Sequence, residues 1–162
     1  MTALMQAVKS KDAARVKELI RQGVNVSELD ANGDAPLVMA AYEGLTEIVR
    51  LLLEAGADVT AVDPGMKATA LHAAAYAGRT EAAKLLIQYK IEIDKQGPYN
   101  GYTALHDAIW QGHAETARVI VEAGANLTRK NHQGQTPLEF ARARGHQELI
   151  TLLEQKLETG HS

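Results

Sequence analysis

Apolar residues recur along the chain at a nearly fixed distance, so the sequence reads as successive copies of one unit. Five leucines are separated by 33, 34, 34 and 33 residues, and each is followed three places later by an alanine. A glycine stands seven places after each of the last four leucines. The leucines are Leu4, Leu37, Leu71, Leu105 and Leu138. A period of this length indicates a stack of supersecondary units rather than one irregular core.

Each unit is predicted to contain two short helices joined by a tight turn. The first helix opens at a threonine, as at Thr69, Thr103 and Thr136, whose hydroxyl can accept a hydrogen bond from a free backbone N–H. The recurring glycine ends this helix, because a left-handed residue at a helix end is least costly as glycine. A glutamate then falls in the first turn of the second helix, where its charge complements the helix dipole. These glutamates are Glu47, Glu81, Glu115 and Glu148.

The repeats occupy the whole chain and leave no separate linker. We assign a single domain over residues 1–162, with units at 2–29, 30–62, 63–96, 97–130 and 131–156. The first unit lacks the entry turn and has Lys9, Ser10 and Lys11 near the end of its first helix. The last unit ends in mixed apolar and charged residues, and terminal units of an array need a polar outer face. We therefore expect these two units to cap the array and the array to be complete.

Three short motifs relate the units to a known family. They are Gly101-Tyr-Thr-Ala-Leu-His106, Gly134-Gln-Thr-Pro-Leu138 and Leu52-Leu-Glu-Ala-Gly-Ala-Asp-Val59. With these motifs the chain resembles ankyrin-repeat proteins over residues 2–156. The resemblance implies an all-α solenoid of about five helix-turn-helix repeats with short β-hairpin or loop fingers. It also implies a scaffold for protein–protein interaction that holds its partner in the concave groove and on the finger tips.

The third unit departs from the pattern. Lys67 stands where the turn glycine belongs, and Lys90 stands where a glycine ends the second helix of other units. A non-glycine residue in the left-handed conformation costs about 1 kcal/mol. The two spacings of 34 residues place one extra residue in the finger near 63–67 and one near 96–102. Irregular loops on a regular scaffold favour binding.

Composition narrows the classes of partner and chemistry. Of the 162 residues, 46% are hydrophobic but only 4% are aromatic, so alanine, leucine, valine and isoleucine must fill the core. The formal charge of -3 and the lack of a basic block argue against nucleic acid, whose binding depends on lysine and arginine at the phosphates. The chain has no cysteine, which excludes disulfides, thiol catalysis and thiolate zinc sites.

Targeting signals are not visible in the sequence. No stretch is apolar over the length that a membrane span needs, and the N-terminus does not read as a signal peptide. We therefore expect a cytoplasmic protein, or a periplasmic or secreted one if a leader was removed. We also expect a monomer that binds another protein, without a membrane, nucleic acid or a cofactor.

Histidines recur at equivalent places, as metal ligands could. His72 and His106 each directly follow the repeated leucine. Neighbouring helices pack roughly 8–10 Å apart, whereas two ligands of one zinc must both approach it to about 2 Å. In the resembled family this histidine forms hydrogen bonds within and between repeats. We therefore assign it to the framework, together with His113 and His146, and predict no metal site.

Catalytic motifs are also lacking. The sequence holds no G-x-S-x-G turn, no phosphate-binding glycine loop and no H-E-x-x-H helix, and its carboxylates form no convincing close pair. We therefore predict that the protein is not an enzyme.

An aromatic ladder is the strongest candidate for a binding site. Tyr42, Tyr76 and Trp110 are 34 residues apart, and each stands two places before the glycine that ends the first helix. In the resembled family this position faces the concave groove and contacts the partner, and aromatic anchors dominate protein interfaces. The alternative is that the rings only pack against neighbouring helices or fingers. The full candidate set is Tyr42, Glu43, Met66, Lys67, Tyr76, Tyr99, Tyr102, Trp110, Gln111 and Arg144.

Charge is expected to vary along the groove. Asp34 and Glu43 add negative charge toward the N-terminal end, and Arg142 and Arg144 add positive charge toward the other end. A polar rim around an apolar centre is the usual anatomy of a protein interface.

Two further functions stay open. A pocket at the irregular third and fourth units could bind a small molecule or hold an enzymatic site. Buried titratable groups converging near Tyr99 and Trp110 would favour that function, and both Tyr99 and Tyr102 are expected near Trp110 if the fingers project over the groove. Alternatively, the array is a docking module within a larger assembly, which an apolar outer face on either cap would favour.

Overall fold

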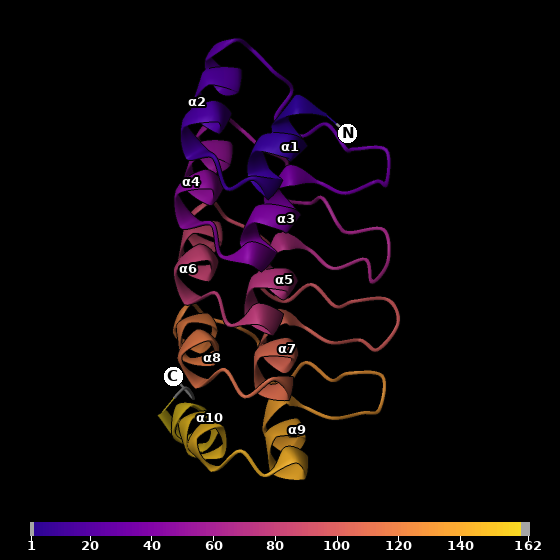
Figure 1. The fold of residues 1–162 in the computed structure, drawn as a ribbon. Coiled ribbons are helices and arrows are strands. Elements are labelled where there is room, and N and C mark those ends of the chain that lie inside the picture. Colours follow the sequence, from indigo (N-terminus) through magenta and orange to yellow (C-terminus); the bar gives the residue numbers. More distant parts are fainter. Residues whose placement is uncertain (1, 160–162) are drawn as a thin grey trace.

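Ten α-helices are formed by residues 2–159, the part of the chain that the computed structural model describes. In chain order they are α1 (Ala3–Lys9), α2 (Ala13–Arg21), α3 (Pro36–Glu43), α4 (Thr46–Glu54), α5 (Ala70–Ala77), α6 (Thr80–Gln88), α7 (Ala104–Trp110), α8 (Ala114–Glu122), α9 (Pro137–Arg144) and α10 (Gln147–Thr159). The odd-numbered, inner helices form one column, and the even-numbered, outer helices form a second column beside it (Figure 1). The predicted all-α repeat solenoid is confirmed.

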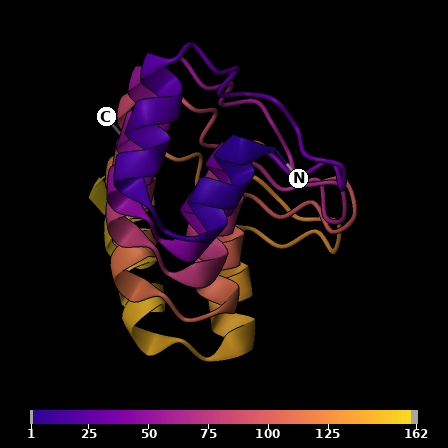
Figure 2. The ribbon, with the colours of Figure 1, turned by 45° about the horizontal axis from the view of Figure 1, so that its top comes forward.

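Four fingers connect each helix pair to the next. They cover residues 22–35, 55–69, 89–103 and 123–136 and project to one side of the molecule (Figure 1). Viewed nearer to the stacking axis, the inner helices lie between the outer helices and the fingers (Figure 2). Within residues 2–159 the β pairing amounts to a single bridge between Val62 and Thr69, so the fingers are loops rather than regular hairpins.

The second and third fingers are each one residue longer at the tip than the first and fourth, as the spacing predicts. In the second finger a backbone hydrogen bond of 2.9 Å runs from Asp63 N to Ala68 O. In the fourth finger the matching bond, also 2.9 Å, spans only Asn131 N to Gln135 O. The third finger closes like the second, and the first closes like the fourth. The longer fingers therefore stand side by side in the middle of the array.

Threonine caps and glycine stops set the ends of the inner helices, as predicted. Thr69, Thr103 and Thr136 each accept a hydrogen bond from the backbone N–H three residues later. The side chain of that third residue bonds back to the threonine backbone, which completes a capping box. The glycines after α3, α5, α7 and α9 have φ between 70° and 73°, the left-handed region that a helix stop requires.

Three lysines adopt the left-handed backbone that usually selects glycine. Lys67 and Lys90 have φ of 58° and 66°, as their places in the third unit predict. Lys11 has φ of 58° where other units have the helix-ending glycine, a position that the sequence analysis did not single out as strained. Each such residue costs about 1 kcal/mol. All three side chains are exposed, so this cost is not recovered by burial.

The core combines leucines on the inner helices with alanines between the helix columns. Leu37, Leu71 and Leu105 are at most 2% exposed, and Ala74 and Ala108 are fully buried. Small side chains at these places let neighbouring helices approach closely. Each unit thus buries its apolar face against its neighbours, as a repeat array requires.

Buried threonine–histidine pairs join successive units, and we call the pairs Thr69–His72 and Thr103–His106 the seams. Nε2 of His72 donates to the carbonyl of Tyr102 at 3.0 Å, and Nε2 of His106 donates to the equivalent carbonyl of the fourth finger at 3.1 Å. Nδ1 of each ring pairs with its threonine. Burial lowers the pKa of both imidazoles, which favours the neutral form. Both rings thus serve the framework, as expected.

Candidate binding groove

The aromatic ladder lies at the C-terminal ends of three neighbouring inner helices. Tyr42, Tyr76 and Trp110 stand in the last turn of α3, α5 and α7. Tyr42 is 46% exposed, Tyr76 is 39% exposed, and Trp110 is half-buried. The rings therefore pack partly on the helices and still present a large aromatic surface to solvent.

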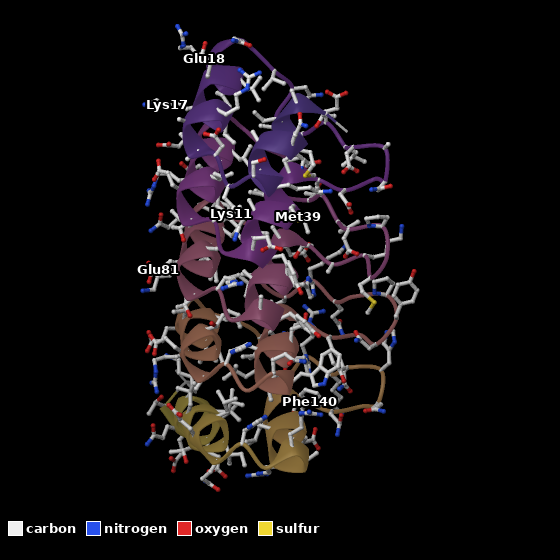
Figure 3. All side chains as sticks on the ribbon, in the orientation of Figure 1. Lys11, Lys17, Glu18, Met39, Glu81 and Phe140 are labelled. Atoms are coloured by element: carbon white, nitrogen blue, oxygen red, sulfur yellow. The ribbon has the colours of Figure 1, made fainter. Side chains whose placement is uncertain are left out.

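A groove of about 470 Å³ lies between the inner helices and the fingers, and we call it the central groove. Its lining comes from α3, α5, α7 and the first three fingers. Its largest lining side chains are Met39, Tyr42, Met66, Tyr76, Tyr102 and Trp110. In Figure 3, Met39 and Phe140 lie on the inner helices toward the fingers, whereas Lys17, Glu18 and Glu81 lie on the outer helices. The side that faces the fingers is thus the apolar and aromatic one.

Trp110 joins two tyrosines from different elements into one wall of the groove. Its ring centroid lies 5.5 Å from that of Tyr76 and 5.5 Å from that of Tyr102, at interplanar angles of 71° and 86°. Tyr102 in turn packs on Phe140 of α9, with ring centroids 5.1 Å apart. Edge-to-face contacts of this kind favour fixed ring orientations. The wall formed by Tyr76, Trp110 and Tyr102 is therefore held in place before any partner arrives.

Asp107 lies one helical turn before Trp110 on the same face of α7. It lines the central groove and is only 9% exposed. Desolvation raises the pKa of its carboxyl from 3.8 to about 8, and no hydrogen bond or charge within residues 2–159 offsets this effect. A strongly shifted pKa inside a cleft marks a candidate functional residue.

Half of the predicted site residues line the central groove. They are Tyr42, Met66, Tyr76, Tyr102 and Trp110. The ladder and two of the finger residues are thus brought together, as expected for a binding surface.

The other half of the candidate set lies outside the groove lining. Tyr99, 60% exposed, sits on the third finger, and ring contact with Trp110 is made by Tyr102 instead. The guanidinium carbon of Arg144 stands 5.7 Å from the ring centroid of Phe140, near the C-terminal end of the array. The remaining side chains, all exposed, are Glu43, Lys67 and Gln111. Of the two finger tyrosines expected near Trp110, Tyr102 is the one that makes the ring contact and lines the groove.

Of the residues expected to grade the charge along the groove, Asp34 belongs to the lining, whereas Glu43, Arg142 and Arg144 lie outside it. Arg142 pairs with Glu154 of α10 at 2.7 Å. The lining instead includes the carboxyl groups of Asp34, Asp63 and Asp107. Burial raises the pKa of Asp107 to about 8, so Asp34 and Asp63 carry the negative charge of the lining near neutral pH.

Sequence reasoning did not single out Asp107. The residue stands two places after the repeated leucine, where the neighbouring units have Ala73 and Phe140. A carboxyl at a place that is apolar in the adjacent units is the signal that the sequence does contain. Its importance rests on burial without a partner, which only the folded arrangement reveals.

The groove does not assemble a catalytic pair from the residues described. His72 lines it, but Nε2 of this ring donates to the Tyr102 carbonyl and Nδ1 pairs with Thr69. Neither nitrogen is therefore free to transfer a proton. Within residues 2–159, no cluster of three histidine, cysteine, aspartate or glutamate side chains is suited to hold a metal ion.

Comparison with models of protein families identifies the repeats. Residues 1–63 and 62–131 each match a family model described as ankyrin repeats in three copies. Together the two matches cover well over half of the 162 residues. The chain belongs to the ankyrin-repeat family. The family suggested by the three sequence motifs is confirmed.

Relatives of this ankyrin-repeat chain share short stretches with it. Ankyrin repeat domain-containing protein 35 of Homo sapiens is 41% identical over 59 residues, which are 36% of this chain and 6% of that protein. Ankyrin repeat and SAM domain-containing protein 6 of Danio rerio is 41% identical over 61 residues, 37% of this chain and 8% of that protein. Palmitoyltransferase Hip14 of Drosophila melanogaster is 36% identical over 69 residues, 43% of this chain and 11% of that protein. The similarity thus spans a small part of each relative.

The ankyrin helices are short. Among the residues that the structure describes, no helix combines the length and the apolar character needed to cross a membrane.

Proposed function

We propose that this ankyrin array is a non-catalytic interaction module that binds another protein in the central groove. One observation carries the proposal: four aromatic side chains, Tyr42, Tyr76, Tyr102 and Trp110, line one groove that also remains open to solvent. Large aromatic anchors contribute disproportionately to protein interfaces, because they remove much apolar area from water at little entropic cost.

The extent of the aromatic surface favours a protein over a small molecule. The ladder runs across α3, α5 and α7, so its rings come from three successive repeats. Solenoids offer extended concave surfaces of this kind to elongated or folded partners. The same role suits an array that forms part of a longer protein, as the repeats do in the relatives.

A small-molecule or enzymatic site in the groove is the second candidate, and Asp107 is the observation that favours it. A groove of about 470 Å³ has the size of many ligand sites, and a buried carboxyl could orient a ligand. General acid–base chemistry needs a second free titratable group, however, and the imidazole of His72 is engaged at both nitrogens. We therefore rank protein binding first.

The experiment compares the wild-type protein with two variants as baits for binding partners. The first variant replaces Tyr42, Tyr76 and Trp110 by alanine together. The matched control is Tyr89→Ala, because Tyr89 is 39% exposed, as Tyr76 is, yet stands after α6 outside the groove lining. Circular dichroism first establishes that both variants keep the helical fold.

A partner that uses the groove is retained by the wild type and by Tyr89→Ala and is lost from the triple variant. The expected loss is then measured as an affinity with the purified partner. If the triple variant retains every partner at undiminished affinity, the central groove is not the binding surface.

A further inference from the structure

The acidic side chains that line the central groove come from three different elements. Asp34 comes from the first finger, Asp63 from the second and Asp107 from α7. No lysine or arginine occurs among the lining residues in the part of the chain described. The nearby lysines Lys67 and Lys95 are exposed and lie outside the lining. Asp34 and Asp63 thus supply the negative charge of the groove, and Asp107, whose pKa burial raises to about 8, becomes charged when a cation stands beside it.

Asp63 already has partners within its own finger. Its carboxyl oxygens accept hydrogen bonds from the backbone N–H groups of Gly65, Met66 and Ala68 at 3.0, 2.9 and 2.8 Å. This carboxylate therefore shapes the finger tip. Asp34 is only half-buried, so water can solvate its carboxyl.

Asp107 differs from both of them. The residue is only 9% exposed, and its carboxyl has no hydrogen-bonding partner among residues 2–159. In the same part of the chain every fully enclosed side-chain nitrogen or oxygen has a partner. The oxygens of Asp107 are therefore not fully enclosed, and they open into the groove that the residue lines. A group in this position loses its hydration without gaining a bond, unless a ligand supplies one.

Three aromatic side chains, Tyr76, Tyr102 and Trp110, line the same groove as this carboxyl. Trp110 follows it by one turn of α7, and Tyr76 and Tyr102 meet the indole at 71° and 86°. Tyr102 also stacks on His106, with ring centroids 5.7 Å apart, while all three aromatic side chains contribute to the groove lining. The faces of aromatic rings attract cations, and the attraction strengthens where water is excluded.

We propose that the central groove binds an arginine side chain of the partner protein, with its guanidinium group against Asp107 and the walls formed by Tyr76, Tyr102 and Trp110. This inference rests on the proposed function and adds the chemistry of the partner to it. The pocket contributes a single unpaired carboxyl, and the guanidinium supplies the donors that this carboxyl lacks.

Arginine fits this site better than lysine for three physical reasons. Its flat guanidinium stacks on aromatic faces, donates two parallel hydrogen bonds to one carboxylate, and is more weakly hydrated than an ammonium group. The surroundings of Asp107, a residue only 9% exposed, favour the cation that loses less hydration on entry. The positive charge also stabilises the ionised form of Asp107, which burial alone disfavours.

The test uses short acetylated and amidated peptide pools that share random flanking residues. One pool has arginine fixed at the centre, a second has lysine, and a third has citrulline, which keeps the shape of arginine without its charge. Trp110 is the single tryptophan of the chain, so its fluorescence reports directly on occupation of the groove. The pools are titrated into the wild type, into Asp107→Asn and into the control Tyr89→Ala.

The arginine pool is expected to bind the wild type and Tyr89→Ala about tenfold or more tightly than the citrulline pool, with the lysine pool in between. In Asp107→Asn the ratio of arginine to citrulline affinity falls to near one, while the affinity for citrulline is unchanged. Because asparagine keeps the shape of aspartate and carries no charge to bury, this variant is expected to fold.

Four results overturn the inference, of which the following three concern the order of affinities. The arginine and citrulline pools bind the wild type equally, the preference for arginine survives in Asp107→Asn, or lysine binds more tightly than arginine. A Trp110 response without charge preference overturns only the arginine pocket and leaves the groove as a binding surface. The proposed function fails separately, when the triple alanine variant retains the protein partners. No response to any pool also overturns the arginine pocket.

Discussion

Two neighbouring residues of α7 lie in different surroundings, one in a seam and the other in the central groove. His106 and Asp107 are 0% and 9% exposed, so both bury a polar group. His106 faces the next repeat, where its ring bonds to the capping threonine and to a carbonyl of the fourth finger. Asp107 faces the groove, where its carboxyl has no such partner within residues 2–159.

The contrast separates two reasons for burying a polar side chain. At the seam the histidine joins two units and satisfies backbone groups that would otherwise be unpaired, so its removal should weaken the fold. In the groove the carboxyl costs stability and stabilises nothing that the structure describes. A costly residue at a surface groove is expected where function, rather than folding, selects it.

The largest loss of stability is expected for a change in the core, and a smaller loss for a change in the groove wall. Leu105→Ala leaves a cavity between repeats and should lower the free energy of unfolding by about 2–5 kcal/mol. Trp110→Ala should lower it less, because the indole is only half-buried at the end of its helix. Denaturation in urea measures both values. The same Trp110→Ala variant should lose about 2 kcal/mol or more of partner affinity.

If Trp110→Ala unfolds the protein as severely as Leu105→Ala, the indole belongs to the core. If it changes neither stability nor affinity, the partner docks on the finger tips or on the outer helices instead.

The second-largest loss of stability is expected for changes in the seams. His106→Ala should cost about 3 kcal/mol, because it opens a cavity and leaves a carbonyl of the fourth finger unpaired. Chemical denaturation again measures the loss. His72→Ala is the matched variant of the neighbouring seam and should behave alike. A cost below about 1 kcal/mol at both seams would show that these hydrogen bonds do not join the units.

Asp107→Asn should raise the stability of the protein, unlike the changes above, and the gain should increase with pH. In the unfolded chain this carboxyl ionises near 3.8, whereas in the folded protein it ionises near pH 8. Between these values the folded state keeps a proton that the unfolded state has released, so the contribution of Asp107 to stability is lost as pH rises. The variant should match the wild type below the lower value and be about 1–3 kcal/mol more stable above the upper one.

Urea denaturation of both proteins at several pH values measures this difference. His72 and His106 act in the reverse sense, since burial lowers the pKa of each ring and their contribution is lost as pH falls. Both histidines are present in both proteins, so their effect cancels in the comparison. A difference that does not grow with pH would place Asp107 in a solvated setting.

The smallest effect concerns a position in neither the seam nor the groove. Lys90→Gly should stabilise the protein by up to about 1 kcal/mol, because Lys90 has φ of 66° and an exposed side chain. Gly56→Lys is the reverse exchange at an equivalent helix end, where φ is 88°, and should destabilise by a similar amount. Thermal denaturation compares the two. Destabilisation by Lys90→Gly would show that the lysine stem packs usefully.

Most of the fold could be predicted from the sequence because the same local features recur in several repeats. Thr69 and Thr103 mark the starts of helices, and glycines at a fixed distance along the chain mark their ends. Even the irregular backbone of Lys67 and Lys90 could be predicted, since each stands where a neighbouring unit has glycine. These features depend on local conformation, which short stretches of sequence determine.

The site is less predictable from the sequence because it depends on how the helices and fingers pack against one another. The ladder residues share a place in the repeat, so the sequence indicated that they share a face. Whether Tyr99 or Tyr102 turns toward Trp110 depends on the path of the finger, and the structure favours Tyr102. The burial of Asp107 likewise results from side chains of several helices and fingers together.

The most direct test of the contrast is an NMR titration of the Asp107 carboxyl carbon in the folded protein. A carboxyl that is buried without a partner should ionise with a pKa of about 8. Asp107→Asn identifies the resonance, because the variant lacks it. A midpoint near the ordinary value of 3.8 would contradict the account, because the carboxyl would then be solvated or paired and would not be held ready for a cationic partner.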